Sequence, residues 1–317
     1  MSNAEMIETR LAESFRRDVL RGLAREHKAI PSRWLYDERG SALFEAITRI
    51  DEYYPTRTEI GILTSRANEL AHFVGPSAVV IEYGAGAAFK TEILLDALSA
   101  PRLYLGIDIA ASFLAQTAER LRLRYPEMRV DSLVADFTKR VDLPAEVPAQ
   151  RRVGFFPGST IGNLDDRESA AFLSAMYKHV GHGGAALVGI DLIKALDVLL
   201  PAYDDAEGVT AEFNRNLLVR INRELGGTFD VESFRHEARW NERVSAVEMH
   251  LVSTREQSVL VGANTFAFAK GETIHSESSR KYTVADFSES IARAGWCAEQ
   301  IWTDERQHYA IIGMRAS

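Results

Sequence analysis

Residues 78–90 read AVVIEYGAGAAFK, a β-branched run that ends in two closely spaced glycines and is followed by helix-forming sequence. β-Branched residues favour a strand, and Gly84 and Gly86 permit the tight backbone turn by which a strand enters a helix. Such a strand–turn–helix unit is typical of folds that bind nucleotide-like ligands against the backbone of the turn. The stretch therefore predicts the first βα unit of an α/β domain.

The same alternation continues outward from this unit to about Leu192. Short β-branched runs alternate with amphipathic helices, which is the pattern of a parallel sheet covered by helices. One of these helices should begin at Asp165–Asp166 and bury four apolar side chains: Phe172, Leu173, Met176 and Val180. The five expected strands are AVVIEYG (78–84), RLYLGID (102–108), RVDSLVAD (129–136), RVGFFPGS (152–159) and AALVGIDL (185–192).

The flanking sequence carries other patterns. Residues 5–29 predict a largely solvated helix, residues 31–59 an irregular aromatic-rich segment, and Glu59 begins a helix that ends at Gly75–Pro76. A further helix should run from about Val209 to Leu225. VSAVEMHLVS (244–253) and TFAFAKGETI (265–274) alternate with period two and suggest an antiparallel pair or sheet. DFSESIARAG predicts a helix, and AEQIWTD with HYAIIGMR a hairpin that closes the edge of the first sheet.

The length of 317 residues fits about two domains. We expect a nucleotide-fold domain formed by residues 59–194 and 283–317, and a second, α+β domain formed by residues 1–58 and 195–282. The second domain would stand over the carboxyl ends of the strands, where open α/β sheets bind their ligands.

Composition narrows the classes of function. The formal net charge is −8 without blocks of either sign, so nucleic acid and anionic membranes are not expected as partners. Cys297 is the only cysteine, which excludes an intramolecular disulfide and a multi-thiolate metal site, and no metal is expected. The sequence has neither a signal peptide nor an apolar run of membrane-spanning length, so we expect a cytoplasmic protein. We also expect a monomer.

The residues of the glycine turn indicate which kind of ligand it would bind. A dinucleotide site would place a third glycine or alanine where Phe89 stands, which disfavours a pyrophosphate ligand. Glu82-x-Gly84-x-Gly86 suits S-adenosylmethionine better, because that molecule has a sulfonium and an amino acid end, for which carboxylates and Lys90 are suitable neighbours. The alternative is an ordinary tight turn without a ligand.

Two acidic residues at further strand ends strengthen the cofactor hypothesis. Asp108 lies 22 residues after Gly86, about the spacing at which a carboxylate accepts ribose hydroxyls in such folds. Asp136 could accept the adenine amino group while Phe137 covers the ring. Either acid alone could be a helix cap.

The sequence also offers polar groups outside the cofactor set. Asn163 follows the constrained stretch FFPGSTIG and could direct an amide at a carboxylate or amine, or simply cap the next helix. Tyr53, Tyr54 and Tyr203 are phenols in loop-like sequence, and each could equally be a packing residue.

Several of these segments together resemble the L-histidine Nα-methyltransferases, which make hercynine in ergothioneine biosynthesis. The resemblance runs from about Ser32 to the end of the chain, and its most specific blocks are FPGSTIGN and GVTAEFNRN. The matching segments, in family order, are YDERGSALFEAI, EYYPTRTE, EYGAGAAFKT, FFPGSTIGN, AYDDAEGVTAEFNRNLL, VEMHL and HSESSRKY.

The resemblance implies a fold, a reaction and a set of site residues. The fold would be a class I, Rossmann-like methyltransferase domain with an inserted α+β substrate-binding domain. The reaction would be transfer of three methyl groups from S-adenosylmethionine to the α-amino group of L-histidine. The implied cofactor set is Tyr36, Gly84, Gly86, Lys90, Asp108, Asp136 and Phe137; the implied substrate set is Tyr53, Asn163, Tyr203, Met249, Glu277 and Ser279.

Within the substrate set, Asn163 and Tyr203 would hold the carboxylate, and Tyr53, Glu277 and Ser279 would bind the imidazole. An imidazole has one N–H and one lone pair, which a carboxylate and a hydroxyl can both satisfy. Without the resemblance, a Glu–Ser turn and core packing of Met249 would be the simpler interpretations. Neighbouring Ser278 and Arg280 could alter the selectivity among aromatic amino acids.

The chain departs from the family at the glycine turn, where Leu-Gly-Ser-Gly followed by Thr or Ser is usual. Here Tyr83, Ala85, Ala87, Ala88 and Phe89 remove hydroxyl contacts to the methionine end of the cofactor, so cofactor affinity is the property in question.

Methyl transfer from a sulfonium is an in-line displacement, so the protein mainly aligns the reactants and must receive the amine deprotonated. We assign Asn163 and Tyr53 to this catalytic alignment and expect protons to leave to water, because no histidine lies in a motif that marks it as a base. Three alternatives remain: a methyltransferase of another aromatic amino acid such as tryptophan, a nicotinamide-dependent oxidoreductase, and a non-catalytic S-adenosylmethionine-binding protein.

Overall fold

The computed structural model describes residues 3–86 and 89–317, so Ala87 and Ala88 of the altered glycine turn lie outside the described residues. The chain divides into two compact units, each built from two separate stretches. We call Tyr54–Lys194 with Ser279–Ser317 the central unit, and Met1–Tyr53 with Ala195–Ser278 the flanking unit. The first and last boundaries thus fall about five residues before those expected from the sequence.

The central unit contains a seven-stranded sheet of order β12-β13-β6-β5-β2-β3-β4. Its strands are β2 (Val79–Tyr83), β3 (Leu103–Asp108), β4 (Arg129–Val134), β5 (Arg152–Phe156), β6 (Ala185–Asp191), β12 (Trp296–Thr303) and β13 (Tyr309–Ala316). The pairings β4–β3, β3–β2, β2–β5 and β5–β6 are parallel, and β13 pairs antiparallel with β6 and β12. The five expected parallel strands and the edge-closing hairpin are therefore confirmed.

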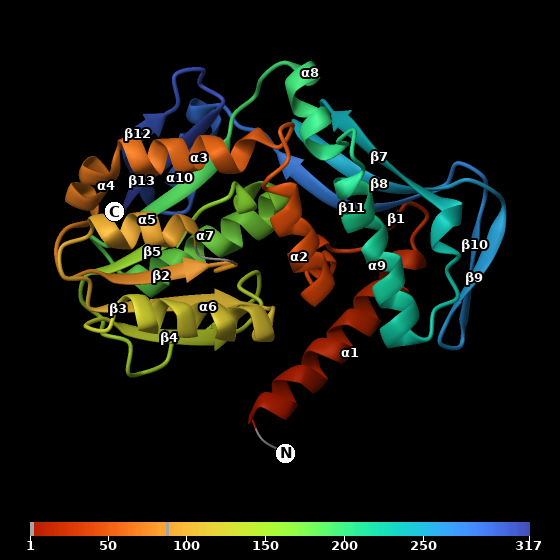
Figure 1. Cartoon of the computed structure of the whole chain (residues 1–317), viewed down its shortest axis with the longest axis horizontal. Coiled ribbons are helices and arrows are strands. Elements are labelled where there is room, and N and C mark those ends of the chain that lie inside the picture. The colour runs from red at the N-terminus through yellow and green to blue at the C-terminus, as the bar shows by residue number, and fades with distance from the viewer. Residues whose placement is uncertain (1–2, 87–88) are drawn as a thin grey trace. The chain divides into compact units, whose positions relative to one another are not determined.

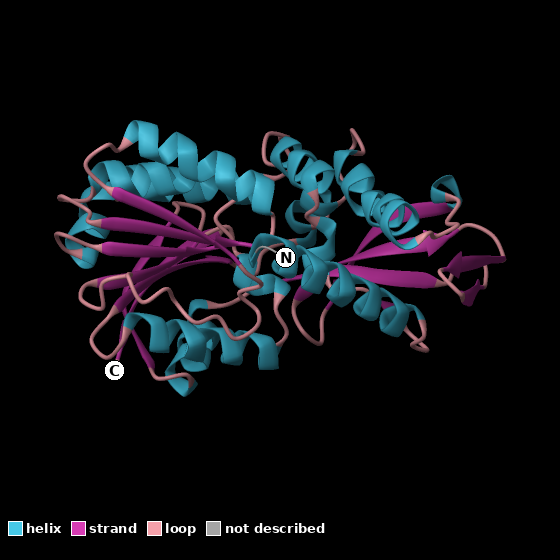
Figure 2. Cartoon of the chain, turned by 90° about the horizontal axis from the view of Figure 1, so that it is seen from below, coloured by secondary structure: helices cyan, strands magenta, loops and turns pink. Residues whose placement is uncertain are grey.

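Helices cover both faces of this sheet (Figures 1 and 2). Along β2, Val79 and Ile81 face a core shared with one group of helices, and Val80 faces the other core. The first core includes α7 (Asp166–Val180) and α10 (Val284–Arg293). The second includes α3 (Tyr54–Ser65), α4 (Ala67–Val74), α5 (Phe89–Ala97) and α6 (Ala111–Arg124). This arrangement confirms the expected doubly covered α/β sheet.

The start of α7 and the bounds of α3 and α4 can be compared directly with the helices predicted from the sequence. Asp165 caps α7 in a reciprocal capping box with Glu168, and the four expected apolar side chains of α7 are buried. The expected helix from Glu59 to Gly75 is wrong in two respects. It begins at Tyr54, with Pro55 in its first turn, and it is interrupted at Arg66, so that α3 and α4 are separate helices.

The flanking unit combines helices with a four-stranded sheet of order β1-β11-β8-β7 and a separate β9–β10 hairpin. Its helices are α1 (Asn3–Leu23), α2 (Glu38–Ile47), α8 (Leu196–Leu199) and α9 (Val209–Leu225), with short 3₁₀ turns at Ser32–Leu35, Pro201–Tyr203 and Val231–Ser233. Its strands are β1 (Lys28–Ala29), β7 (Phe234–Asn241), β8 (Ala246–Ser253), β9 (Gln257–Val261), β10 (Asn264–Phe268) and β11 (Thr273–Arg280), the last of which ends in the central unit. The bounds of α9 confirm the expected helix.

Other expectations for this unit hold only in part. The first helix forms as expected and most of its described side chains are exposed or half-buried, but it also buries Phe15, Val19 and Leu23 along one face, which the sequence analysis did not foresee. The segment expected to be irregular contains α2, which Asp37 caps by accepting a hydrogen bond from the Gly40 N–H at 2.8 Å.

The two alternating segments form strands, but most of the second segment does not pair with the first. β8 pairs antiparallel with β7 and neighbours β11, to which the last two residues of the second segment, Thr273 and Ile274, belong. The rest of the second segment forms β10, which pairs antiparallel with β9. Period-two alternation identifies a strand but not its partner. Among the residues that the structure describes, no helix has the length and apolar character needed to cross a membrane.

Candidate functional site

The glycine turn of the central unit is held by the end of the neighbouring strand. Gly84 and Gly86 have φ of 72° and 42°, a region that other residues rarely adopt. The Gly84 N–H donates to the Ile107 carbonyl at 2.8 Å, and the Gly86 N–H donates to Asp108 Oδ2 at 3.2 Å. Asp108 Oδ1 accepts from the Ala110 N–H at 2.9 Å. The structure thus brings Asp108 to the turn, as the spacing suggested.

Burial changes the acidity of both carboxyl groups near this turn. It raises the pKa of Asp108, although the Ala110 and Gly86 N–H groups oppose the shift. It raises the pKa of Glu82 to about 8, against the hydrogen bonds that Thr91 Oγ1 and Tyr104 OH donate to Oε2 at 2.6 and 2.5 Å. Glu82 therefore lies inside the sheet as a buried, hydrogen-bonded carboxyl group behind the turn.

The third strand end contributes an aromatic ring to the turn. A Cβ placed on Gly84 would lie 3.5 Å from Phe137 Cε1, so the ring lies beside this glycine at the distance of a side-chain contact. The ring also packs edge-on against Phe156, at 5.5 Å between centroids. Asp136 Oδ1 accepts from Thr138 N and Oγ1, at 3.0 and 2.5 Å. Phe137 is thus at the turn, whereas Asp136 makes hydrogen bonds within its own loop.

Lys90 has a buried partner that the sequence analysis did not single out. Its Nζ lies 2.6 Å from Glu59 Oε2, and Glu59 is 1% exposed. Both Glu59 oxygens also accept from the Gly158 N–H, at 3.0 and 2.9 Å. One carboxylate thus links the first turn of α5 to the loop that follows β5. Its signal in the sequence was weak, since an acid inside a predicted helix is usually solvated.

Asn163 ends the 3₁₀ turn Thr160–Asn163, in the loop after β5. Ser159 precedes this turn with φ of 54°, and Gly162 allows a close backbone approach. A Cβ on Gly162 would lie 2.8 Å from the Arg280 carbonyl oxygen and 3.0 Å from its nitrogen. The loop that presents Asn163 is therefore packed directly against the end of β11, which carries Ser279.

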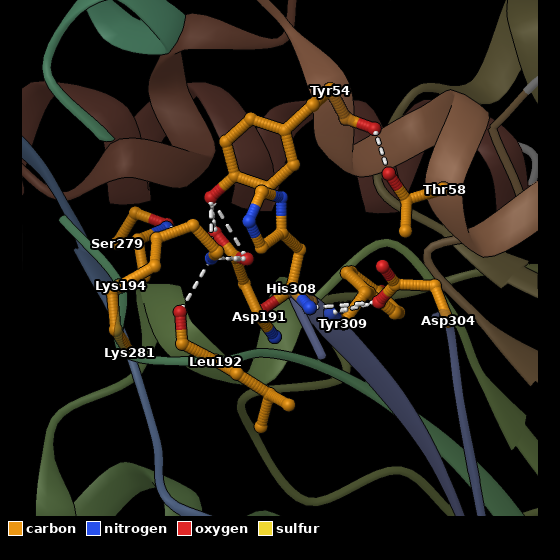
Figure 3. Close-up of polar contacts among 11 residues, drawn as sticks. Tyr54, Thr58, Asp191, Leu192, Lys194, Ser279, Lys281, Asp304, His308 and Tyr309 are labelled. Atoms are coloured by element: carbon orange, nitrogen blue, oxygen red, sulfur yellow. Dashed lines mark hydrogen bonds and ion pairs between the residues drawn. The ribbon is translucent and has the colours of Figure 1, made fainter. Parts of the chain in front are cut away.

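A buried polar cluster lies at the carboxyl end of β6 (Figure 3). Asp191 is fully buried, and its carboxylate accepts from Tyr54 OH at 2.9 and 2.7 Å. Lys194 Nζ lies 2.6 Å from Oδ1, and Lys281 Nζ lies 2.7 Å from Oδ2. Burial would raise the pKa of Asp191, but the Lys281 and Lys194 ammonium groups lower it below its usual value. Burial lowers the pKa of Lys194 to about 8, although Asp191 opposes the shift.

Ser279 belongs to the same cluster, since Lys281 Nζ donates to its Oγ at 2.8 Å. The sequence analysis singled out Tyr54 only as a phenol, and missed Asp191, Lys194 and Lys281. The available signal was that Asp191 ends the fifth strand, at the edge where ligands bind in such sheets.

In the flanking unit, three expected substrate residues gather around Tyr36. Tyr36 OH donates to Glu277 Oε1 at 3.3 Å, and the rings of Tyr53 and Tyr203 lie 6.0 Å apart in an edge-on arrangement. Phe44 joins them, at 5.5 Å from Tyr36 and 6.1 Å from Tyr53 between ring centroids. Burial and the neighbouring Glu277 raise the pKa of Tyr36 well above its usual value, so its hydroxyl stays protonated.

The other selectivity candidates have structural contacts as well. Met249 is 2% exposed on β8, and its carbonyl accepts from Ser276 Oγ at 3.0 Å. Ser278 Oγ is 3.0 Å from His275 Nε2, and Arg280 pairs with Asp166. Tyr36 shares the flanking unit with Tyr53, Tyr203, Met249 and Glu277, whereas the other expected cofactor residues lie in the central unit. Asn163 and Ser279 are the substrate candidates in the central unit.

Comparison with known proteins places these residues in a family context. A family model described as a histidine-specific, S-adenosylmethionine-dependent methyltransferase matches residues 15–316. The chain is 40% identical over 304 residues to a histidine N-alpha-methyltransferase of Mycobacterium tuberculosis, covering 94% of each sequence. It is also 40% identical over 299 residues to the Mycolicibacterium smegmatis enzyme of the same name, covering 92% of each. An L-tryptophan methyltransferase of Psilocybe serbica is 26% identical over 338 residues, covering 94% of this chain and 92% of that one.

Proposed function

This chain belongs to the histidine-specific, S-adenosylmethionine-dependent methyltransferase family, and we propose from that membership how its residues act. It transfers three methyl groups from S-adenosylmethionine to the α-amino group of L-histidine and so forms hercynine, as in ergothioneine biosynthesis. The family membership sets aside the nicotinamide-dependent oxidoreductase, since the matched family uses S-adenosylmethionine.

The groups around the glycine turn fit S-adenosylmethionine. Asp108 lies at the turn, where it can exchange its backbone contacts for ribose hydroxyls, and Phe137 offers a ring face beside Gly84. Lys90 has three ammonium hydrogens, so it can hold Glu59 and a ligand carboxylate at once. When bound, the cofactor supplies an activated methyl group whose leaving group is a neutral thioether.

The observation that carries the substrate assignment is the buried carboxylate of Glu277 among phenols. Glu277 is 7% exposed and accepts a hydrogen bond from Tyr36. A buried carboxylate is unfavourable unless hydrogen bonds satisfy it, and an imidazole N–H would supply one. Tyr53 and Ser279 complete the contacts to the ring, while Met249 fixes the shape of the surrounding wall.

We assign Tyr36 to the substrate rather than to the cofactor, because its hydroxyl bonds Glu277 and its ring lies in the same cluster as Tyr53 and Tyr203. Asn163 and Tyr203 hold the substrate carboxylate. Fixing both ends of the amino acid leaves the α-nitrogen as the only group free to meet the methyl donor.

The α-ammonium must lose a proton before each transfer, since a protonated nitrogen has no lone pair. Tyr36 is unsuited to act as the base, because its raised pKa makes the phenolate unfavourable. The site therefore selects the neutral amine and releases its protons to water.

The test is to incubate the protein with S-adenosylmethionine and L-histidine, and separately with L-tryptophan and L-tyrosine, and to read the product masses. We expect gains of one, two and finally three methyl groups on L-histidine alone. Methylation of L-tryptophan instead would favour the alternative substrate, and no gain on any amino acid would favour the non-catalytic binding protein. Asn163→Ala should raise the KM for L-histidine; unaltered turnover would remove Asn163 from the site.

A further inference from the structure

Two buried ammonium groups contact one carboxylate in the cluster around Asp191 (Figure 3). Two ammonium groups, those of Lys194 and Lys281, contact the two oxygens of Asp191 at 2.6 and 2.7 Å. Their side chains are 6% and 0% exposed. One lysine would neutralise the carboxylate. Burial of a second ammonium is unfavourable unless that group makes hydrogen bonds that the protein uses.

The two lysines differ in what else they contact. Lys194 Nζ donates to Tyr54 OH at 2.7 Å and to the Leu192 carbonyl, so its further hydrogen bonds go to other residues of the cluster. Lys281 Nζ instead donates to Ser279 Oγ at 2.8 Å. Lys281 is therefore the member that connects the cluster to a residue assigned to the substrate.

The hydrogen bond from Lys281 determines whether the Ser279 hydroxyl can donate or accept toward a ligand. An ammonium group has hydrogens but no lone pair, so Ser279 Oγ can only accept from Lys281. The hydrogen of the Ser279 hydroxyl must then point away from the lysine. Without Lys281 the hydroxyl could rotate and either donate to or accept from a ligand.

We propose that Lys281, anchored on Asp191, is a positioning residue that makes Ser279 a hydrogen-bond donor to the lone-pair nitrogen of the substrate ring. The inference rests on the proposed function, which assigns Ser279 to the imidazole. Ser279 and Glu277 are two positions apart on β11, so their side chains leave the strand on the same face.

Glu277 and Ser279 together determine which hydrogen-bonding groups the substrate ring must have. A carboxylate accepts from a ring N–H, and the oriented hydroxyl donates to a ring lone pair. Together they select neutral imidazole in one tautomer. An indole ring has an N–H but no lone-pair nitrogen, so it would leave the Ser279 donor unsatisfied, which is a stronger means of rejection than size alone.

The first test compares Lys281→Met with Lys194→Met, because each variant leaves Asp191 paired with one lysine. Binding of L-histidine is measured by calorimetry in the presence of S-adenosylhomocysteine. Lys281→Met should weaken binding about tenfold, while Lys194→Met should change it by less than about twofold. Ser279→Ala should weaken binding as much as Lys281→Met, and the double variant should lose nothing more. Equal effects of the two lysine variants, or additive losses in the double variant, would overturn the proposal.

The second test reads the direction of the hydrogen bond and does not depend on the folding of Lys281→Met. 4- and 5-Thiazolylalanine have a lone-pair nitrogen without an N–H at one or the other of the two imidazole nitrogen positions, and 2- and 3-pyrrolylalanine have an N–H without such a lone pair at one or the other. Ser279→Ala should weaken binding of the better-bound thiazolylalanine about as much as that of L-histidine and leave the better-bound pyrrolylalanine unchanged. The reverse pattern would show that Ser279 accepts, and would overturn the proposal. Failure of the wild-type protein to bind L-histidine at all would instead contradict the proposed function.

Discussion

Glu59 pairs with Lys90 at 2.6 Å and accepts the Gly158 N–H with both of its oxygens. The carboxylate comes from α3, the ammonium from α5 and the N–H from the loop after β5. The position of Gly189 on β6 makes this arrangement possible, since a Cβ there would lie 2.2 Å from Glu59 Oε1. Glu59 therefore fixes the cation proposed for the cofactor and the loop that carries Asn163 at the same time.

The two partners of this ion pair should contribute unequally to stability. The Lys90 side chain is 18% exposed and that of Glu59 is 1% exposed. Lys90→Met leaves a buried carboxylate without its cation and should lower the free energy of unfolding by about 3–5 kcal/mol. Glu59→Gln should cost less, because the ammonium can reach water and the amide oxygen still accepts from Gly158. Urea denaturation without ligand measures both values, and the double variant should recover most of the loss from Lys90→Met. Simple additivity of the two losses would contradict this view of the pair.

Glu82 should make stability depend on pH. Its pKa rises from 4.5 to about 8 on burial, so between these values the native state keeps a proton that the unfolded state has released. Raising the pH through this window therefore favours unfolding, by up to about 1.4 kcal/mol per pH unit from this group. Glu82→Gln keeps the acceptor for Thr91 and Tyr104 and removes the titration. Urea denaturation at a series of pH values should give a flatter profile for the variant; parallel profiles would show that Glu82 does not titrate in this window.

The sheet could be predicted from the sequence because each of its central strands is a continuous apolar run. Val79, Val80 and Ile81 are fully buried on both faces of β2, which is what such a run indicates in a parallel sheet. The start of α3 carried a signal that was overlooked, since Pro55 in its first turn is a common helix beginning. The break at Arg66 had no such signal, because neither glycine nor proline marks it.

The candidate site likewise has contacts that the sequence could predict and contacts that it could not. Asp108 could be placed near Gly86 because one ends a strand and the other follows the adjacent parallel strand, so spacing along the chain implies proximity. The cluster of Asp191 and Lys281 could not, because its members come from strands and loops distant in sequence and each is an ordinary charged residue by itself. Contacts within one βα unit are visible in a sequence, whereas pairs made by tertiary packing require the fold.

Tyr36→Phe tests the assignment of Tyr36 to the substrate. Burial and Glu277 raise the pKa of the Tyr36 hydroxyl, so it is a donor at every working pH, and its removal leaves Glu277 with one hydrogen bond fewer. The affinity for L-histidine should fall about 5- to 10-fold, while that for S-adenosylmethionine stays unchanged. Tyr125→Phe serves as the control, because it removes a hydroxyl that follows the last residue of α6 and donates to Asp96. A loss of S-adenosylmethionine affinity in Tyr36→Phe would return Tyr36 to the cofactor set.

Gly162→Ala tests whether the close packing of the Asn163 loop against β11 supports function. A Cβ at this position would meet backbone atoms of Arg280 at 2.8 and 3.0 Å, and a backbone cannot yield as a side chain can. We expect a loss of about 1–3 kcal/mol in the free energy of unfolding and a higher KM for L-histidine, because the loop must move away from Ser279. Gly61→Ala is the matched control, since nothing lies within 4 Å of a Cβ there and alanine in a helix should stabilise α3 by up to about 1 kcal/mol. If both variants behave alike, the contact between Gly162 and Arg280 is not what holds Asn163 in place.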